Sequence, residues 1–287
     1  MEEVQQILVA TDRSAMAEEA LKRAISLAEE KSAQLIVVHV VEPLFFESPY
    51  TASADLDAIR KQLTEEIDRL NMQACVEYLL FVESGSAAGV IKRNAQKTQA
   101  DLIVVGSHGK DDIDSNYFGS TTLKLIQRTH IPVLIVKNAV KTVYQNMIAP
   151  TNLSDYSKES IQFVNTLFPG THKKYLYAFQ TISKLQAKTY NISDEVADEL
   201  RAINTRDAAK TFAAFVKEVG GGEMGLIEYT ASINEDLLTY IKEDRADLLV
   251  LGSKGVDDLN SFVFGSTASY LLNRSPIDVL VYVPAST

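Results

Sequence analysis

Short apolar runs alternate with longer amphipathic stretches along the whole chain. In the first half, five runs rich in Val, Ile and Leu are predicted to form strands, at Ile7–Ala10, Leu35–Val41, Val76–Val82, Leu102–Val105 and Val133–Val136. Several of these runs are apolar at successive positions, which is typical of parallel strands that are buried on both faces. The pattern therefore predicts a parallel sheet covered by helices on both sides.

The stretches between the strands have helical spacing. Residues 15–30 place apolar side chains along one face, and Ser14 is the predicted N-cap. Residues 54–72 show the same periodicity, and further helices are predicted around Val90 and Leu123.

The second half repeats this order. Strands are predicted at Asn146–Pro150, Lys174–Phe179, Leu248–Leu251 and Val279–Val283. A long helix is predicted to follow the second strand, with the apolar residues Val196, Leu200, Ile203, Phe212, Phe215, Val216 and Val219. The helix is predicted to end at Gly220–Gly222, and a capping box at Ser232–Glu235 opens the next one.

Alternating strands and helices require crossover connections, which predicts an α/β fold of two tandem doubly wound domains. Each domain is expected to hold a five-stranded, mostly parallel sheet flanked by helices, similar to a Rossmann fold. The short join near residues 138–144 predicts domains at residues 1–138 and 144–287. The second half has six extra residues between its first-strand end and its fourth-strand end, which we expect in its long helix or the flanking loops.

Composition narrows the classes of function. The 287 residues carry a net charge of −10, which argues against binding to nucleic acid or to an anionic membrane surface. Cys75 is the single cysteine and excludes both an internal disulfide and a cysteine-built zinc site. The sequence begins without the basic and apolar regions of a signal peptide, so we expect a cytoplasmic protein.

One glycine pattern occurs twice at the same internal spacing, each time directly after an apolar run. The first copy consists of Gly106, Ser107, His108, Gly109 and, after nine further residues, Gly119, Ser120 and Thr121. The second copy consists of Gly252, Ser253, Lys254, Gly255 and, after nine further residues, Gly265, Ser266 and Thr267. A strand that ends in a glycine turn, followed by a helix N-terminus, is suited to binding phosphate through backbone N–H groups. The doubled pattern therefore predicts a tandem duplication with a candidate phosphate site in each half.

Three features of the chain together resemble the universal stress protein family in its tandem two-domain form. Ile7–Ser14 looks like the opening strand and acidic turn of the family, and Asp101–Gly109 looks like its fourth strand and glycine loop. The pattern G-x2-G-x9-G-[ST] of the nucleotide-binding members occurs in both halves. The resemblance covers nearly the whole chain, and it implies a fold that binds ATP in some members and no nucleotide in others.

The resemblance also implies which residues hold the nucleotide. In the first half they are Asp12, Val40 and Val41 for the adenosine, with Gly106, Gly109, Gly119, Ser120 and Thr121 for the phosphates. His108 lies inside the glycine loop and is a further candidate for contact with a phosphate. In the second half they are Asn152, Gly252, Gly255, Gly265, Ser266 and Thr267. Asn152 lacks the charge of Asp12, and Ala178–Phe179 would crowd an adenine, so the second site is predicted to be the weaker one. The expected cofactor is ATP, or ADP or AMP, with Mg²⁺ held through the phosphates rather than by the protein.

Three classes of function stay open. The leading hypothesis is a nucleotide-binding stress sensor or adaptor with an unidentified protein partner. The second is an interaction protein that binds no nucleotide, whose halves pair through Val133–Val136 and Val279–Val283 as a pseudo-dimer. The third is a slow ATPase or a nucleotidyl- or phosphoryl-transferring enzyme, with Asp12 or His108 as the nearest acid–base groups.

The three carboxylates Asp111, Asp112 and Asp114 are either a solvated loop or an aid to Mg²⁺ binding. The chain is either a monomer of two fused domains or a homodimer of such monomers.

Overall fold

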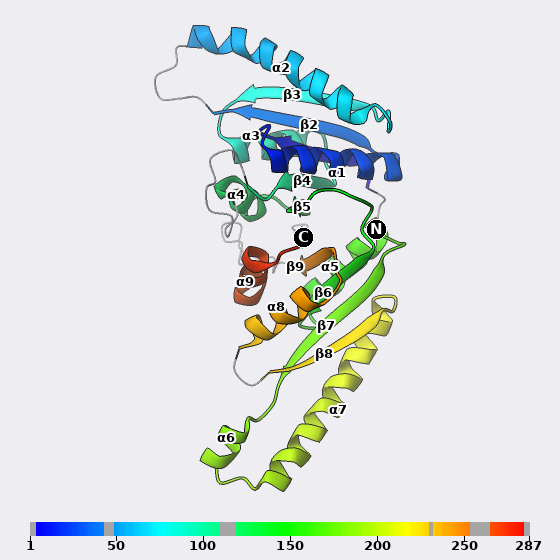
Figure 1. The fold of residues 1–287 in the computed structure, drawn as a ribbon, viewed down its shortest axis with the longest axis vertical. Coiled ribbons are helices and arrows are strands. Elements are labelled where there is room, and N and C mark those ends of the chain that lie inside the picture. The colour runs from blue at the N-terminus through cyan, green and yellow to red at the C-terminus, as the bar shows by residue number, and fades with distance from the viewer. Residues whose placement is uncertain (1–3, 43–48, 109–118, 230–231, 253–264, 284–287) are drawn as a thin grey trace. The chain divides into compact units, whose positions relative to one another are not determined.

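The chain folds into two compact α/β units. A computed structural model describes residues 4–42, 49–108, 119–229, 232–252 and 265–283 (Figure 1). Within these residues, the first unit contains the chain up to Val143 together with the C-terminal segment from Ile277. The second unit runs from Tyr144 to Gly252 and from Gly265 to Pro276. No helix of the described ranges is long and apolar enough to cross a membrane.

The sheet of the first unit has the strand order β3-β2-β1-β4-β5-β10. Its strands are β1 (Gln6–Thr11), β2 (Gln34–Val41), β3 (Tyr78–Ser84), β4 (Leu102–Gly106), β5 (Val133–Val136) and β10 (Asp278–Tyr282). The strands β1 to β5 pair in parallel, and β10 pairs antiparallel with β5, with Leu280 opposite Leu134. The predicted pairing of the last strands of the two halves is therefore observed.

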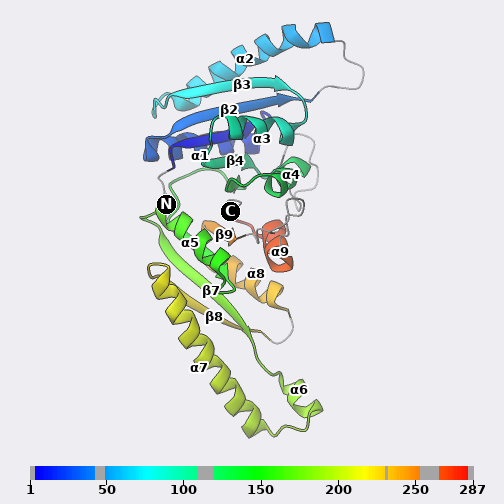
Figure 2. The same cartoon turned by 180° about the vertical axis from the view of Figure 1, so that it is seen from behind.

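Helices cover both faces of this sheet. They are α1 (Ala15–Lys31), α2 (Pro49–Asn71), α3 (Ala87–Lys97) and α4 (Ser120–Arg128). Figures 1 and 2, which show opposite sides, have α1 in front of the sheet in one view and α3 in front of it in the other. The winding reverses between β1 and β4, so the carboxyl ends of these two strands flank the place where ligands bind in doubly wound sheets.

The second unit repeats the arrangement with the strand order β9-β6-β7-β8. Its strands are β6 (Asn146–Thr151), β7 (His172–Gln180), β8 (Glu223–Tyr229) and β9 (Leu248–Gly252). Its helices are α5 (Asp155–Leu167), α6 (Lys184–Thr189), α7 (Asp194–Glu218), α8 (Ile233–Glu243) and α9 (Ser266–Arg274). The predicted fold class, two tandem doubly wound α/β domains, is thereby confirmed.

Several element boundaries differ from the predicted ones. The strand expected from Val76 begins instead at Tyr78, because the Asn71 side chain accepts a hydrogen bond from the Val76 N–H and donates one to the Val76 carbonyl. Strand β8 and helix α6 were not predicted. The six extra residues of the second half lie between β7 and α7, where α6 is inserted.

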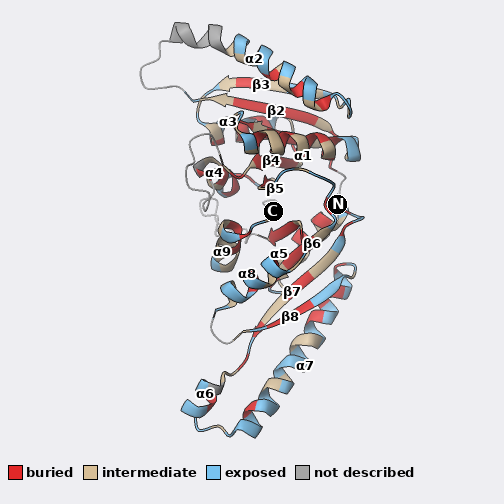
Figure 3. Cartoon of the chain, viewed as in Figure 1, coloured by how far each residue is buried: buried red, intermediate tan, exposed pale blue. Residues whose placement is uncertain are grey.

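The predicted apolar residues of α7 are only partly buried. Phe212, Phe215 and Val216 are buried, whereas Val196 and Leu200 are 48% and 40% exposed. Figure 3 shows exposed stretches along much of α7. The predicted long helix is therefore present, but its large apolar residues are buried only in its second half. Periodicity shows which side chains share a face but not whether the sheet extends far enough to cover it.

The end of β5 carries a half-buried ammonium group beside a buried carboxylate. Burial lowers the pKa of Lys137 from its usual 10.5 to about 8, and the charge of Asp278 opposes this shift. Between these two pH values the unfolded chain binds more protons than the folded one, so the free energy of unfolding rises with pH across this window.

Replacing Lys137 by methionine is expected to remove this dependence. Below about pH 8 the variant should be more stable than the parent by about 1 to 2 kcal/mol, a value reduced for the water that reaches the side chain. The advantage should shrink as the pH rises toward 10.5. Urea denaturation of both proteins at a series of pH values measures the difference, and a difference that does not change with pH would contradict the assignment.

Candidate functional site

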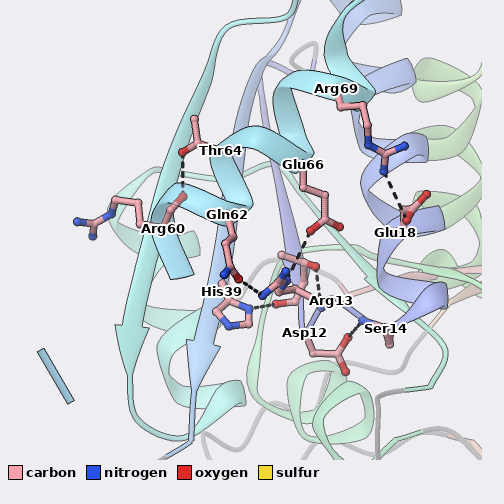
Figure 4. Close-up of polar contacts among 11 residues, drawn as sticks. Asp12, Arg13, Ser14, Glu18, His39, Arg60, Gln62, Thr64, Glu66 and Arg69 are labelled. Carbon is pink, nitrogen blue, oxygen red and sulfur yellow. Dashed lines mark hydrogen bonds and ion pairs between the residues drawn. The ribbon is translucent and has the colours of Figure 1, made fainter. Parts of the chain in front are cut away.

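The turn that follows β1 is closed by its own side chains (Figure 4). The Thr11 hydroxyl accepts from the Arg13 N–H at 3.1 Å, and the Asp12 carboxylate accepts from the Ser14 N–H at 2.9 Å. Ser14 then caps α1 by accepting from the Ala17 N–H at 3.2 Å. Arg13 has a φ of +64°, which the turn requires. One oxygen of Asp12 is therefore used to hold the turn that starts α1.

A layer of polar side chains joins this turn to its neighbours. Arg13 donates to Gln62 of α2 at 2.9 Å and lies 3.6 Å from the Glu66 carboxylate. The buried His39 ring, on β2, contacts the Thr11 carbonyl through Nδ1 at 2.7 Å. Figure 4 shows these groups meeting at the end of β1. The role of Arg13 was not predicted, because its partners on α2 are about 50 residues away in the chain.

The end of β4 lies directly against the start of α1. A Cβ atom on Gly106 would come within 2.9 Å of the Met16 carbonyl carbon and 3.1 Å of the Ala17 nitrogen. Only a glycine allows the two backbones to approach this closely. Packing against α1 is therefore sufficient to explain Gly106.

His108 connects the glycine loop to the turn after β1. Its carbonyl accepts from the Ser14 hydroxyl at 3.4 Å, and its Nδ1 lies 2.8 Å from the Ser107 hydroxyl. Its Nε2 atom is buried and has no hydrogen-bond partner among the described residues. A buried ring nitrogen without a partner fits an additional polar group at this loop.

The N-terminus of α4 follows the loop and lacks a side-chain cap. Gly119 is the N-cap residue, and its own N–H donates to the Ser107 carbonyl at 3.2 Å. In the described part of the chain, the N–H groups of Thr121 and Thr122 in the first turn of α4 have no acceptor. Unused N–H donors and the positive end of the helix dipole together favour an anion at this position.

Helix α9 also lacks a side-chain cap at its N-terminus. In this respect α4 and α9 differ from most of the other helices. The hydroxyls of Ser14, Ser154, Ser183, Ser193 and Ser232 accept at the N-termini of α1, α5, α6, α7 and α8. Gly119 and Gly265 stand at the corresponding positions of α4 and α9, the helices that follow β4 and β9. Both glycines have ordinary negative φ angles, −56° and −58°, so the backbone does not require glycine at either position.

The second unit keeps the turn but uses its side chains differently. Asn152 accepts through Oδ1 from the Ser154 N–H at 3.2 Å, the Ser154 hydroxyl at 2.6 Å and the Ser157 hydroxyl at 2.9 Å. Gly252 lies against α5, where an added Cβ would be 3.2 Å from the Ser160 hydroxyl oxygen. Where β2 has His39, β7 has Tyr177, whose ring packs 5.6 Å from the Phe212 ring.

The structure thus brings together part of the predicted site of each unit. Asp12, Gly106, His108 and Gly119 lie on connected turns, and the carboxyl end of β2 places Val40 and Val41 on the same edge of the sheet. Asn152, Gly252, Gly265, Ser266 and Thr267 occupy the corresponding places in the second unit. Gly109, Gly255 and the acidic residues Asp111, Asp112 and Asp114 lie outside the described residues, as does the side chain of Ser120. The described ranges hold no group of three or more His, Cys, Asp or Glu residues that could bind a metal ion.

Comparison with known proteins identifies the family. The sequence model of the universal stress protein family matches the chain twice, at residues 3–137 and 144–283. The chain therefore belongs to the universal stress protein family, of which it is a tandem two-domain member.

Curated relatives resemble one half of the chain. Universal stress protein MJ0531 of Methanocaldococcus jannaschii is 31% identical over 145 residues, which are 47% of this chain and 83% of the relative. Universal stress protein YxiE of Bacillus subtilis is 30% identical over 144 residues, which are 46% of this chain and 97% of the relative.

Solved structures match the whole chain in fold. A universal stress protein from Archaeoglobus fulgidus has a TM-score of 0.70 at 14% identity, over 99% of this chain and 100% of that one. A functionally unknown protein of Pseudomonas aeruginosa, PA1789, has a TM-score of 0.69 at 18% identity, over 98% and 93% of the two chains. At these identities the likeness establishes the fold alone.

Proposed function

We propose that this universal stress protein binds an adenine nucleotide in its first unit and acts as a nucleotide-dependent sensor or adaptor in a stress response. The adenosine would lie at the carboxyl ends of β1 and β2, near Asp12, Val40 and Val41. The phosphates would lie at the N-terminus of α4, and any Mg²⁺ would be held through them.

The observation that carries the proposal is the use of glycine as the N-cap of α4. Ser, Asp and Asn are preferred at this position because their side chains accept from the first N–H groups of a helix. At α4 the glycine provides no such acceptor, and among the described residues these donors have none, at the end of the strand where the winding of the sheet reverses. His108 adds a buried nitrogen without a described partner at the same loop.

The decisive experiment replaces Gly119 by aspartate. The new carboxylate would accept from the first N–H groups of α4 and place a negative charge where the phosphates are proposed to bind. We expect the variant to be more stable by about 0.5 to 1 kcal/mol and to bind nucleotide at least about 100-fold more weakly at this site. A loss of affinity that accompanies a gain in stability cannot be attributed to unfolding.

Calorimetry with ATP, ADP and AMP, with and without Mg²⁺, measures the affinity, and thermal denaturation measures stability. Ser193→Asp provides a matched control, since it places the same charge at the N-terminus of α7. The proposal would be rejected if the parent bound none of the three nucleotides at millimolar concentration. It would also be rejected if Gly119→Asp bound them as tightly as the parent.

For the second unit the contacts favour a different function. This unit would bind a protein partner and would itself hold no nucleotide. Three donors already occupy the Asn152 oxygen, and the Tyr177 and Phe212 rings pack at the carboxyl end of β7. Gly265→Asp tests this unit separately, because an added Cβ there meets no atom within 4 Å. If the second unit holds no nucleotide, this substitution should leave the number of bound nucleotides and their affinity unchanged.

A further inference from the structure

Exposed apolar side chains are concentrated on one part of the second unit. Four of the eight large apolar residues that are exposed in the described ranges lie on α6, directly after it, or on the first half of α7: Leu185, Tyr190, Val196 and Leu200. Leu185 and Tyr190 are 76% and 72% exposed. Both views of the fold show α6 and the start of α7 extending past the end of β8 (Figures 1 and 2). The sheet of this unit does not cover them.

On α7 these side chains have the spacing of a helix–helix interface. Val196, Leu200 and Ile203 follow one another at intervals of four and three residues, which is the interval of core positions in a coiled coil. We call these three residues the α7 seam. Beside the seam, Ala197 is buried within the unit, whereas Glu199 lies on the other flank and is exposed. The seam is therefore open to a second helix from that flank.

The charges along α7 change sign at the seam. Residues 194–199 carry four carboxylates, whereas residues 200–210 carry three cations and one carboxylate, Asp207. The Arg201 guanidinium is engaged by the Ile182 carbonyl and by Asp198. Arg206 and Lys210 are exposed, and the Arg206 side chain, 77% exposed, lies 3.9 Å from the Asp207 carboxylate of the same helix. A helix with an acidic first half and a basic second half is complementary to an antiparallel copy of itself.

We propose that the α7 seam is the contact surface for a second copy of this chain, packed antiparallel about a two-fold axis. In the register where Leu200 meets Ile203 of the second copy, Glu199 faces Arg206 of the second copy, and the two-fold axis repeats the pair. Lys210 then lies opposite the carboxylates of Asp194 and Glu195. Sliding the helices so that Glu199 faces Glu199 would place like charges together, so the charges select the first register.

Charge reversal at the two flanking positions tests this surface on the full chain. Glu199→Arg alone and Arg206→Glu alone each place like charges across the axis and should weaken self-association at least about tenfold. An equimolar mixture of the two variants should form a mixed dimer, because each Arg then faces a Glu. The double variant Glu199→Arg/Arg206→Glu should associate with itself as the parent does.

Sedimentation velocity from about 1 µM to about 1 mM measures the association, and circular dichroism confirms that each variant is folded. Thr205→Glu is the control, since this exposed residue is adjacent to Arg206 but lies on the side of the helix away from the seam. Recovery of association in the mixture, with Thr205→Glu unaffected, supports the proposal. A monomeric parent at every concentration, variants that associate like the parent, or equal disruption by Thr205→Glu would overturn it.

Discussion

Replacement of Gly106 by alanine is expected to lower the free energy of unfolding by about 2 to 3 kcal/mol. The added Cβ would lie 2.9 Å from the Met16 carbonyl carbon and 3.0 Å from the Met16 oxygen, and both are backbone atoms. Helix α1 cannot move away easily, because Ser14 caps it and Leu21 and Ile25 are buried in the core. Chemical denaturation of the variant and the parent measures the loss.

Gly252→Ala in the second unit is the matched control for this prediction. There the Cβ would be 3.2 Å from the Ser160 hydroxyl oxygen and 3.3 Å from the Tyr156 carbonyl oxygen. The contacts are longer, and the nearest atom belongs to a side chain that can turn, so we expect a loss below about 1 kcal/mol. Equal losses at the two sites would show that the approach of α1 is not the reason for Gly106.

The glycine pattern thus has more than one physical cause. Gly106 must be glycine because a Cβ at this position would collide with the backbone of α1. Gly119 has φ and ψ angles that any residue can adopt. From the sequence alone the two glycines look equivalent, because spacing does not show what a Cβ would meet. Gly119 is therefore stronger evidence for a ligand than Gly106, because the conformation of the backbone does not require a glycine at position 119.

The fold was predictable because the signals that define it are local. Uninterrupted apolar runs marked the parallel strands, Ser14 marked the start of α1, and the repeated glycine spacing marked the duplication. One sequence does not specify the order of the strands in a sheet, and this order was not predicted. The structure places them as β3-β2-β1-β4-β5 in the first unit, followed by β10.

The missed features depend on contacts that are not local. Arg13 contacts Gln62 and Glu66 on α2. The sequence around Gln62 and Glu66 contains no motif from which this contact could be predicted. Strand β8 was missed because Glu223, Gly225 and Glu228 interrupt its apolar pattern, which leaves only Leu226 and Ile227 as successive apolar residues. The exposure of Val196 and Leu200 follows from where the sheet ends rather than from α7 itself.

The turns after β1 and β6 differ by having Asp12 in one and Asn152 in the other, and the sequence alone predicts only part of the effect of this difference. Asn152 was expected to weaken the second site through its missing charge. In the structure Asp12 and Asn152 both accept from the N–H two residues later, so the turn is preserved. What differs is that the Asn152 oxygen also accepts from the hydroxyls of Ser154 and Ser157.

Asp278→Ala is expected to have the largest effect on stability, a loss of about 3 to 5 kcal/mol. The Asp278 side chain is buried, and its Oδ1 accepts from the Lys137 N–H at 2.8 Å and the Asn138 N–H at 3.1 Å. Alanine would leave both donors without this acceptor and remove the charge that faces the Lys137 ammonium. Because Asp278 begins β10 and Lys137 follows β5, the loss should be greatest where these two strands pair.

Asp278→Asn separates the hydrogen bonds from the charge. The amide keeps an oxygen at the position of Oδ1, so the two N–H groups can retain their acceptor, and the loss should fall to about 1 kcal/mol. Chemical denaturation gives the stability of both variants, and hydrogen exchange of the β5 and β10 amides shows where protection is lost. Protection should fall first in these two strands in Asp278→Ala. If the alanine and asparagine variants were equally stable, the buried acceptor would not be what anchors β10 to β5.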